Sequence, residues 1–401
     1  MNIQQQTGSD TARLRHALAE QLAAAGVLRS AGWRAAVEAV PRELFTGDFF
    51  TTTEPDRSQV TLYSPSTSLD PDQQLELVYS DDTWVTQLNG DTWPGDITKP
   101  RTGTPTSSST MPSLVVRMWE DLDVSPGQKV LEIGTGTGYS TALGSHYLTG
   151  DSIWSIEVDQ AVAERAAAAL RAGRYHPHLV VGDGLAGYAP AAPYDRVIAT
   201  CALRSIPQAW VEQTRPGGII LVTLDGRLGA TGLAKLEVTG PETAEGAFID
   251  PDVGFMPART RRPEEVLTIP DTSYDAALGY RPTEAGPDVF DGPSALLRVI
   301  QLAAPEAHYM YTDPEWGMGL PEHLVIESDR SYVRFHRDST SPSGWAVQQG
   351  GRRLIWDVVE PAIASWRSAG EPELTAFRIQ ITPDRQTISF GSEEGWELPP
   401  V

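Results

Sequence analysis

The pattern of apolar and polar residues divides the chain into three regions, with changes near residue 113 and near residue 260. Between 113 and 240, short apolar runs typical of buried strands are separated by segments with the spacing of amphipathic helices. Strands that alternate with helices predict a mostly parallel sheet joined by right-handed crossovers. We therefore predict an α/β fold with a doubly wound sheet for this part of the chain.

The predicted elements of this domain follow one another closely. SLVVRMWEDL, from 113 to 122, predicts an amphipathic helix ahead of the first strand, KVLEIG. The later elements are GTGYSTALGSHYL (loop and helix), SIWSIEVD (strand), AVAERAAAALRAG (helix ended by Gly173), HLVVGDG and YDRVIATCA (strands), IPQAWVEQTRPGG (helix, then a turn at 216–218) and IILVTL (strand).

The N-terminal region predicts two helices followed by a long irregular stretch. A helix over 11–25 ends at Gly26, and a second helix over roughly 30–40 begins after Ser30 as its N-cap. The apolar face of the first helix consists of Leu14, Leu18, Leu22 and Ala25. Residues 46–108 are rich in Thr, Asp, Pro and Gly and show no clear period, which indicates a functional loop or strands that the pattern does not reveal.

Beyond about 260 the pattern changes again and predicts a small α+β extension. EHLVIESDRSYVRFHRD and ELTAFRIQITPDRQTISF each predict a strand, a turn and a strand, and RRLIWDVVEPAIASWRSAG between them predicts a helix interrupted by Pro361. The expected organisation is therefore N-terminal helices with an inserted loop over 1–112, the α/β core over 113–260 and the extension over 261–401.

Composition and charge narrow the range of partners. The chain of 401 residues has 53 acidic and 31 basic residues and a net charge of −22. The electric field of this charge repels nucleic acid and anionic membranes and attracts basic peptides. Of the two explanations for the charge, a basic partner or plain solubility, we favour solubility. No apolar run approaches the length of a membrane span, so we expect a soluble, cytoplasmic protein. The single cysteine, Cys201, excludes an intramolecular disulfide framework.

A glycine-rich loop carries the first chemical signal. LEIGTGTGY places Gly134, Gly136 and Gly138 directly between a strand and a helix. Glycines let the backbone adopt positive φ and approach a ligand closely. The dinucleotide pattern GxGxxG fails here, because its third glycine falls on Tyr139. The pattern ExGxGxG suits a small zwitterion and a ribose, without a pyrophosphate.

Acidic residues near the ends of three successive strands complete the predicted cofactor site. Glu132 precedes the glycines, Glu157 suits the ribose hydroxyls, and Asp183 suits an adenine amino group. This acidic set favours S-adenosylmethionine, a sulfonium cation, over an NAD-type cofactor. The expected cofactor-binding residues are Glu132, Gly134, Thr135, Gly136, Gly138, Tyr139, Glu157, Val158, Gly182, Asp183, Gly184 and Thr200.

A series of motifs resembles the protein-L-isoaspartate O-methyltransferases, in the order found in that family. They are VPRELF (40–45), VYSD (78–81), SSTMP (108–112), VLEIGTGTGYSTA (130–142), SIEVD (155–159), GDG (182–184), PYDRVIAT (193–200) and FMP (255–257). VPRELF and SSTMP discriminate best, because most other enzymes that use S-adenosylmethionine lack them. The resemblance covers about 11–260 and implies a Rossmann-like class I S-adenosylmethionine-dependent methyltransferase.

Within this family, the chain resembles the methyltransferases of ATP-grasp peptide maturase (graspetide) systems. The stretch GTPTSSSTMPSLVVRM and the strand-rich C-terminal extension carry this resemblance, since repair enzymes normally end near the position of 260. It implies carboxyl methylation of an aspartate in a ribosomal precursor peptide, with or without prior crosslinking by an ATP-grasp ligase. The methyl ester would then close to an aspartimide. Repair of damaged proteins, and a peptide-binding scaffold with a vestigial cofactor fold, are the alternatives.

Three hydroxyl residues are the candidates for binding the methyl acceptor. Thr110 stands where the family has a serine at its catalytic site, and Ser108 and Ser109 precede it. An aspartate is already ionised at pH 7, and hydroxyl or amide donors hold it without the loss of nucleophilicity that a close cation causes. We expect Ser108, Ser109 and Thr110 to act in this way at a helix N-terminus, with simple helix capping as the alternative. We expect no metal site.

Overall fold

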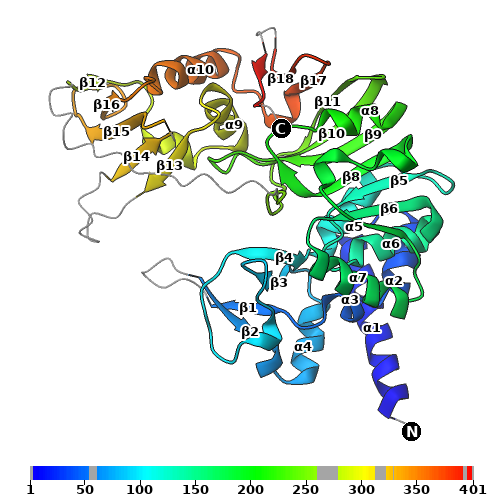
Figure 1. Ribbon diagram of the computed structural model, residues 1–401. Coiled ribbons are helices and arrows are strands. Elements are labelled where there is room, and N and C mark those ends of the chain that lie inside the picture. The colour runs from blue at the N-terminus through cyan, green and yellow to red at the C-terminus, as the bar shows by residue number, and fades with distance from the viewer. Residues whose placement is uncertain are drawn as a thin grey trace. The chain divides into compact units, whose positions relative to one another are not determined.

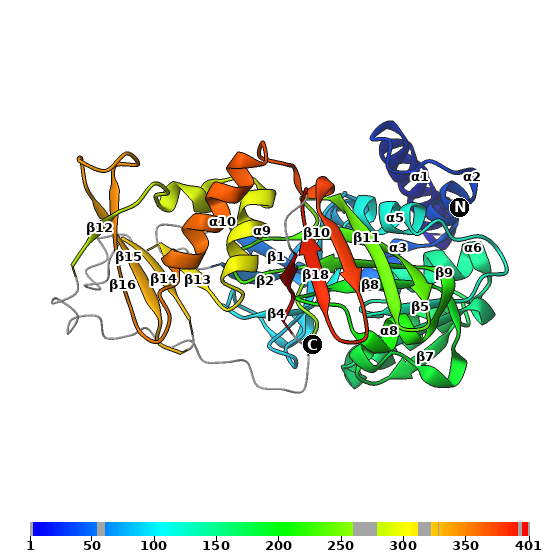
Figure 2. The same cartoon turned by 90° about the horizontal axis from the view of Figure 1, so that it is seen from above.

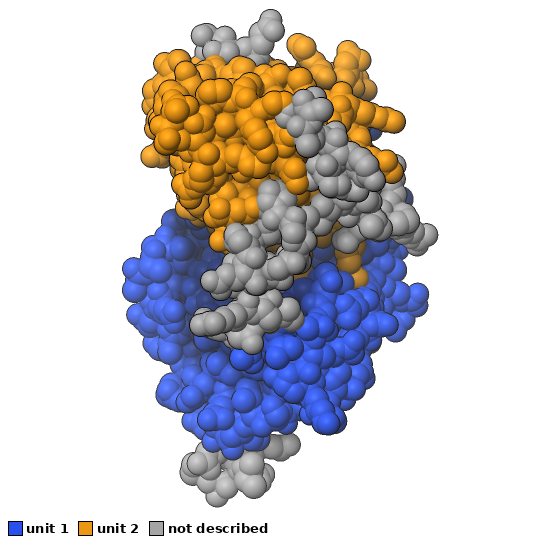
Figure 3. Space-filling view, turned by 90° about the vertical axis from the view of Figure 1, so that its left-hand side faces the viewer, with its two compact units in different colours: residues 1–201, 207–221 blue, residues 202–206, 222–401 orange. Residues whose placement is uncertain are grey.

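The structure, a computed structural model, describes residues 3–53, 61–259, 279–311, 322–327, 329–391 and 395–399, with side chains from residue 10 onwards. Contacts between residues divide the chain into two units, which Figure 3 colours separately. Unit 1 consists of Met1–Cys201 and Pro207–Leu221, and unit 2 consists of Ala202–Ile206 and Val222–Val401. The chain therefore leaves unit 1 twice.

Unit 1 is built on a sheet whose strands lie in the order β9-β8-β5-β6-β7 (Figure 1). The bounds of these strands are β5 (Val130–Ile133), β6 (Ile153–Glu157), β7 (His178–Val181), β8 (Tyr194–Leu203) and β9 (Thr214–Leu224). β5 pairs in parallel with both β6 and β8, and β6 pairs in parallel with β7. The predicted doubly wound α/β fold is confirmed. The strand order reverses at β5, and open sheets bind ligands at the carboxyl ends of the strands beside such a point.

The helices of unit 1 lie where the sequence predicts them, with α3 inside VPRELF as an addition. They are α1 (Ile3–Ala24), α2 (Ala31–Ala39), α3 (Arg42–Thr46), α5 (Pro112–Asp121), α6 (Tyr139–Leu148), α7 (Gln160–Ala172) and α8 (Gln208–Glu212). Ser30 caps α2 as expected, and Gly26 after α1 has a φ of 75°. On the expected apolar face of α1, Leu18 and Leu22 are buried, whereas Ala25 is exposed because it lies beyond the last helical residue.

Aromatic rings join α2 to α5 and α6. The ring centroid of Trp33 lies 5.1 Å from that of Trp119 and 4.3 Å from that of Tyr147. Trp119 is fully buried, and a Cβ atom added to Gly144 of α6 would lie 2.7 Å from its indole. Packing therefore requires a glycine here, although glycine costs a helix about 1 kcal/mol relative to alanine.

The stretch 46–108, which showed no period in the sequence, forms a small antiparallel sheet with the order β2-β1-β3-β4. Its elements are β1 (Phe50–Thr53), β2 (Leu62–Pro65), α4 (Pro71–Val78), β3 (Trp84–Leu88) and β4 (Pro105–Ser109). Phe50, Tyr63 and Leu88 form its buried core. The strands are short and rich in Thr and Ser on both faces, so they lack the apolar alternation that reveals a strand. We call this element the inserted sheet.

Unit 2 contains two antiparallel strand arrangements, which Figure 2 shows from above. The first has the order β10-β11-β17-β18-β19, with β10 (Gly232–Gly240), β11 (Thr243–Asp250), β17 (Arg378–Ile381), β18 (Gln386–Ser389) and β19 (Trp396–Glu397). The second has the order β12-β16-β15-β14-β13, with β12 (Arg281–Pro282), β13 (His308–Tyr311), β14 (His323–Ile326), β15 (Tyr332–Arg337) and β16 (Trp345–Gly350). Helices α9 (Ser294–Ala303) and α10 (Trp356–Ser368) lie on one side of the second sheet in both views.

The two units do not follow the expected division at 112 and 260. Residues before 112 belong to unit 1 with the core, and β10 and β11 belong to unit 2. β11 pairs with β17, which comes from the far C-terminal part of the chain. The pairing of β11 with β17 joins residues far apart in the sequence and leaves no local pattern. The prediction from the sequence therefore assigned the residues of β10 and β11 to the α/β core.

Both predicted hairpins of the C-terminal region are present, as β14–β15 and β17–β18. Two local predictions are wrong. The helix α10 continues through Pro361, and the expected turn at 216–218 lies inside β9, where Gly217 has a φ of 75°. Strand pairing and burial on neighbouring elements overrode these local signals.

Among the described residues, no helix combines the length and apolar character needed to cross a bilayer.

We expect the substitution Gly144→Ala to destabilise the protein despite its better helix propensity. The new methyl group would lie 2.7 Å from the buried Trp119 ring, and overpacking of this kind costs about 1–3 kcal/mol. Urea denaturation measures this loss. The control is Gly95→Ala, where an added Cβ atom meets nothing within 4 Å, so its stability should stay close to that of wild type. Equal or higher stability of Gly144→Ala would contradict the packing argument.

Candidate active site

The glycine-rich loop between β5 and α6 adopts the torsions that its sequence indicates. Gly134, Gly136 and Gly138 have φ values of 93°, 53° and 88°. Other residues pay roughly 1–2 kcal/mol for such left-handed torsions. Gly138 is the N-cap of α6, and the N–H of Gly134 donates to the carbonyl of Ile156 at 2.9 Å. The loop is therefore tied to β6, the strand beside β5.

Two neighbouring strands approach the loop glycines, closely at Gly134 and at ordinary contact distance at Gly136. A Cβ atom on Gly134 would lie 2.8 Å from the hydroxyl of Thr200, which donates to the Gly134 carbonyl at 2.6 Å. A Cβ atom on Gly136 would lie 3.6 Å from the carbonyl oxygen of Ser108. The loop thus lies between β8 and β4, and it brings the predicted cofactor and acceptor residues together.

Glu157 lies at the end of β6 with its carboxylate against the loop. It accepts hydrogen bonds from the N–H of Gly136 at 2.9 Å and from the N–H of Asp159 at 3.1 Å. Its exposed fraction is only 5%, and the half-buried Val158 follows it. The position is the one expected for a ribose-binding acid. Glu157 also supports the loop that it borders.

Asp183 lies on the turn that follows β7, beside the end of β6. The N–H of Gly182 donates to the Glu157 carbonyl at 2.9 Å, and the exposed Asp183 carboxylate accepts from Leu185 N at 3.0 Å. Gly184 fits tightly, because a Cβ atom there would lie 2.5 Å from Ile133 Cγ2. Asp183 is therefore placed beside Glu157 with its side chain open to solvent.

Glu132 does not face the crevice, contrary to the sequence prediction. It is fully buried within β5 and accepts hydrogen bonds from the hydroxyls of Thr141 at 2.5 Å and Ser155 at 2.7 Å. Burial raises the pKa of its carboxyl, and hydrogen bonds from Ser140, Thr141 and Ser155 oppose that shift. Glu132 therefore connects α6 to β6 beneath the loop. It stabilises the two elements that flank the loop and does not contact a ligand through its carboxylate.

Two further residues of the predicted cofactor set turn their side chains inwards. The hydroxyl of Thr135 is buried against that of Ser155 at 2.7 Å. The ring of Tyr139 packs against Phe45 and the Arg42 guanidinium, and burial raises the pKa of its hydroxyl to about 12. Only backbone groups of Thr135 and Tyr139 therefore remain for a ligand, and the N–H of a first-turn residue such as Tyr139 has no partner within its helix.

Most of the polar run before α5 is a strand, β4, so of the two alternatives left open for this stretch, a loop or unrevealed strands, the strands are confirmed here. Ser107 and Ser109 point to one face, where the Ser109 hydroxyl lies 2.9 Å from that of Thr46 and both serines are buried. Ser108, and Thr110 directly after the strand, are half-buried on the other side. Among the described residues, neither the Ser108 nor the Thr110 hydroxyl has a hydrogen-bond partner. Of the three predicted hydroxyls, Ser109 is thus engaged in structure and two remain available.

The N-terminus of α5 is already capped from the inserted sheet. The N–H of Met111 donates to the hydroxyl of Thr83 at 3.0 Å, and the N–H of Ser113 donates to the carboxylate of Asp81 at 2.8 Å. These amides are therefore not free to hold a substrate, as the sequence prediction had suggested. The capping alternative is wrong as well, because Thr83 and Asp81 accept these hydrogen bonds, and none of Ser108, Ser109 and Thr110 does.

Sequence reasoning missed Arg42, the most connected residue near this site. Its side chain is fully buried and donates to the carbonyls of Val78 at 2.5 Å, Ser80 at 2.7 Å, Asp82 at 2.8 Å and Thr110 at 3.2 Å. Burial lowers its pKa. Arg42 holds the segment 78–82 against Thr110. Its place inside VPRELF was the available signal.

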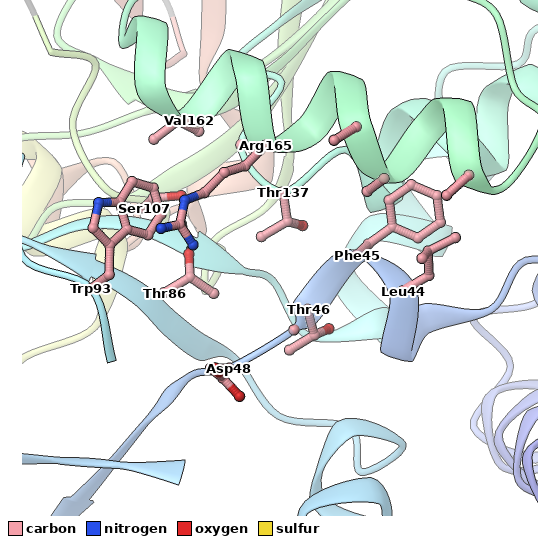
Figure 4. Close-up of a pocket in the computed structure, with 15 residues that line it drawn as sticks. Leu44, Phe45, Thr46, Asp48, Thr86, Trp93, Ser107, Thr137, Val162 and Arg165 are labelled. Carbon is pink, nitrogen blue, oxygen red and sulfur yellow. Dashed lines mark hydrogen bonds between the residues drawn. The ribbon is translucent and has the colours of Figure 1, made fainter. Parts of the chain in front are cut away.

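A cavity of about 400 Å³ opens at the tip of the glycine loop (Figure 4). α3 contributes Phe45 and Thr46 to its wall, the inserted sheet contributes Thr86, Trp93 and Ser107, the loop contributes Gly136 and Thr137, and α7 contributes Val162 and Arg165. The guanidinium carbon of Arg165 lies 3.6 Å from the Trp93 ring centroid. The sequence analysis singled out neither residue for this role, because only the fold brings 93 and 165 together.

Other reactive groups do not add chemistry to this site. Burial raises the pKa of the Cys201 thiol to about 12, so it stays protonated at neutral pH. His178 stacks on Trp154 with a centroid distance of 4.3 Å. Within the described ranges, no group of three or more His, Cys, Asp and Glu side chains is arranged to hold a metal ion.

The residues present fit S-adenosylmethionine. The loop glycines hold positive φ, Glu157 and Asp183 lie at neighbouring strand ends as predicted, and the loop carries none of the basic residues that a pyrophosphate attracts. The parallel sheet with this loop at its switch point defines a class I S-adenosylmethionine-dependent methyltransferase, which is an enzyme.

Comparison with known proteins identifies the family. The model of the protein-L-isoaspartate(D-aspartate) O-methyltransferase (PCMT) family matches residues 96–237. The protein-L-isoaspartate O-methyltransferase of Ignicoccus hospitalis is 37% identical over 150 residues, which cover 36% of this chain and 69% of the relative. That of Methylorubrum populi is 38% identical over 146 residues, covering 36% and 67%, and that of Pyrococcus horikoshii is 41% identical over 112 residues, covering 28% and 50%. The chain belongs to the protein-L-isoaspartate O-methyltransferase family.

A solved structure titled protein-L-isoaspartate O-methyltransferase aligns with 94% of this chain and 99% of its own, with a TM-score of 0.54 and 20% identity. At that identity the likeness concerns the fold. The sequence matches span between half and about two thirds of the relatives' length.

The substitution Gly134→Ala should weaken binding of S-adenosylmethionine by about tenfold or more. It combines a left-handed torsion, costing roughly 1–2 kcal/mol, with a Cβ atom 2.8 Å from the Thr200 hydroxyl. Isothermal titration calorimetry measures the affinity. The double variant Gly134→Ala/Thr200→Ala should recover part of the loss, because it removes the clash. Unchanged affinity in the single variant would show that the glycine loop does not bind the cofactor.

Proposed function

We propose that this enzyme methylates the side-chain carboxylate of an aspartate in a ribosomally synthesised precursor peptide of the graspetide or imiditide type. The methyl ester then closes to an aspartimide. The observation that carries the proposal is the inserted sheet, which sets a hydroxyl-bearing strand and a 400 Å³ cavity beside the glycine loop. A peptide substrate needs such a wall, since its flanking residues must be held while one side chain reacts.

The residues around the acceptor suit methyl transfer to a carboxylate. Bound S-adenosylmethionine supplies an electrophilic methyl group on a sulfonium ion. The acceptor is ionised at neutral pH, so the protein needs to position it and exclude water rather than remove a proton. The hydroxyls of Ser108 and Thr110 can donate to one carboxylate oxygen and leave the other to attack. The cation nearest this segment, Arg42, directs its donors to backbone carbonyls and away from the acceptor.

The second step takes place on the peptide itself. A methyl ester is a better electrophile than a carboxylate. The backbone nitrogen of the following residue attacks the ester carbonyl, a C–N bond forms, and methoxide leaves with the amide proton as methanol. The product is a five-membered succinimide, here the aspartimide.

Repair of isoaspartyl residues in damaged proteins is the second candidate function, and the names of the relatives favour it. The C-terminal extension does not decide between the two, because a solved structure of that name aligns with 94% of the chain. What favours a dedicated peptide substrate is the threonine at 110, the inserted sheet, and a charge of −22 that would attract a basic peptide.

Mass spectrometry of any short precursor peptide encoded beside this gene, incubated with S-adenosylmethionine and the full-length protein, tests the proposal. We expect a gain of one methylene unit, followed by the loss of methanol. The peptide is tested both free and after treatment with any neighbouring ATP-grasp ligase. The control is the same peptide with its target Asp replaced by Asn, which should stay unmodified. Turnover of generic isoaspartyl peptides without modification of any precursor would instead establish repair.

Thr110→Ala should lower kcat/KM for methylation by about 10–100-fold, since a hydrogen bond to a charged group contributes about 1.5–3 kcal/mol. Thr110→Ser should retain most activity. Ser109→Ala is the matched control: it removes the buried contact with Thr46 and should lower stability by about 1 kcal/mol with little effect on kcat. A larger loss of kcat in Ser109→Ala than in Thr110→Ala would move the acceptor site to the other face of β4.

A further inference from the structure

Arg165 occupies an unusual electrostatic position on α7. Its guanidinium carbon lies 3.6 Å from the ring centroid of Trp93, which comes from the inserted sheet, and Figure 4 shows the two side chains next to each other at the cavity. In the described part of the chain, no carboxylate lies within ion-pair distance of Arg165. A cation without an acidic partner is notable in a protein with 53 acidic and 31 basic residues.

The stack with Trp93 orients the Arg165 guanidinium and leaves its N–H groups available to bind an anion. The contact occupies the flat face of the guanidinium and restricts its rotation, whereas its N–H groups point outward in the plane. Those N–H groups match the two oxygens of a carboxylate in a bidentate pair, which is among the stronger protein hydrogen-bonding arrangements. The ligand that this arrangement favours is therefore a carboxylate.

The rest of the cavity favours a peptide as the source of that carboxylate. Leu44, Phe45, Val162 and Ala169 provide apolar surface, and the hydroxyls of Thr86 and Ser107 provide polar groups. Asp48 lines the same cavity and accepts a hydrogen bond from Gln74 at 3.2 Å. A mixed lining of this kind suits an extended chain with an acidic side chain.

The cavity also lies beside the proposed reaction site. It shares Gly136 with the glycine loop, and its wall residue Ser107 directly precedes Ser108. An extended peptide advances about 3.3 Å per residue. A side chain in the cavity therefore belongs to a residue only a few positions from the methyl acceptor.

We propose that this cavity is a specificity pocket that takes an acidic side chain of the peptide substrate, near the target aspartate, and pairs it with Arg165. The inference rests on the proposed function in taking a peptide as substrate. It assigns Arg165 to a second carboxylate, so the acceptor itself stays among hydroxyl donors and keeps its nucleophilicity. Trp93 acts as the positioning residue for Arg165.

Paired peptides and variants test this assignment. The probes are synthetic peptides around the target Asp that carry one Glu at successive positions on either side, each with a Gln counterpart. Wild type should bind and methylate one Glu peptide with a KM about tenfold below that of its Gln counterpart. Arg165→Gln should abolish this preference with kcat nearly unchanged, and Trp93→Leu should reduce it. Arg171→Gln, an exposed position of α7 outside the cavity lining, is the matched control and should keep the preference.

Calorimetry separates the possible outcomes. The affinity for S-adenosylmethionine should be the same in wild type and Arg165→Gln. Weaker cofactor binding in the variant, with no change in the Glu preference, would assign the cavity to the cofactor and overturn the proposal. A wild-type enzyme that methylates Glu and Gln peptides equally would also overturn it, while leaving the proposed function intact. Peptides that bind with an Arg165-dependent Glu preference but are never methylated would uphold the pocket and remove the proposed function.

Discussion

The buried guanidinium of Arg42 is the interaction on which the substrate side of unit 1 depends. A buried charge is costly unless its hydrogen bonds are satisfied, and both terminal nitrogens of Arg42 donate to backbone carbonyls, those of residues 78, 80, 82 and 110. These carbonyls belong to the segments around VYSD and SSTMP, and Arg42 itself belongs to VPRELF. Three motifs that are far apart in the sequence therefore meet in space at one side chain, that of Arg42.

The active site is assembled from two halves that meet at Gly136. On one side, Thr200 and Glu157 hold the glycine loop through its carbonyl and its N–H. On the other side, the carbonyl of Ser108 approaches the same glycine. The glycine loop is thus held by the parallel sheet, and the proposed acceptor half is formed by the inserted sheet. In the proposed acceptor half, Ser108 and Thr110 offer hydroxyl donors, Arg42 donates to backbone carbonyls, and Arg165 stacks on Trp93.

The inserted sheet shows why a long polar stretch need not be a flexible loop. Its strands are only four or five residues long, and Thr and Ser occupy both faces. Its order comes from the pairing of β3 with β4 and from hydrogen bonds such as that between Thr46 and Ser109. Such polar contacts stabilise a small sheet that has a core of only a few apolar residues. The same contacts decide which hydroxyls are structural and which remain for a substrate.

The parallel sheet, its helices and the glycine loop could all be predicted from the sequence. Buried strands, amphipathic helices and positive-φ glycines leave local signals, and local signals also placed Glu157 and Asp183 at strand ends. The direction of each side chain could not be predicted in this way. Glu132 and Tyr139 turn into the protein because Ser155, Thr141, Phe45 and Arg42 surround them.

The sequence by itself determined the glycine loop and the acids at the strand ends, because these features lie in a short run of residues and in strand ends that follow one another along the chain. Only the tertiary structure decided which side chains face the site, and it alone formed the proposed acceptor half. Arg42, Trp93, Ser108 and Arg165 come from separate elements, and each gains its role from contacts made across the fold. Contacts between residues distant in the chain have no local pattern, so their chemistry appears only when the chain is folded.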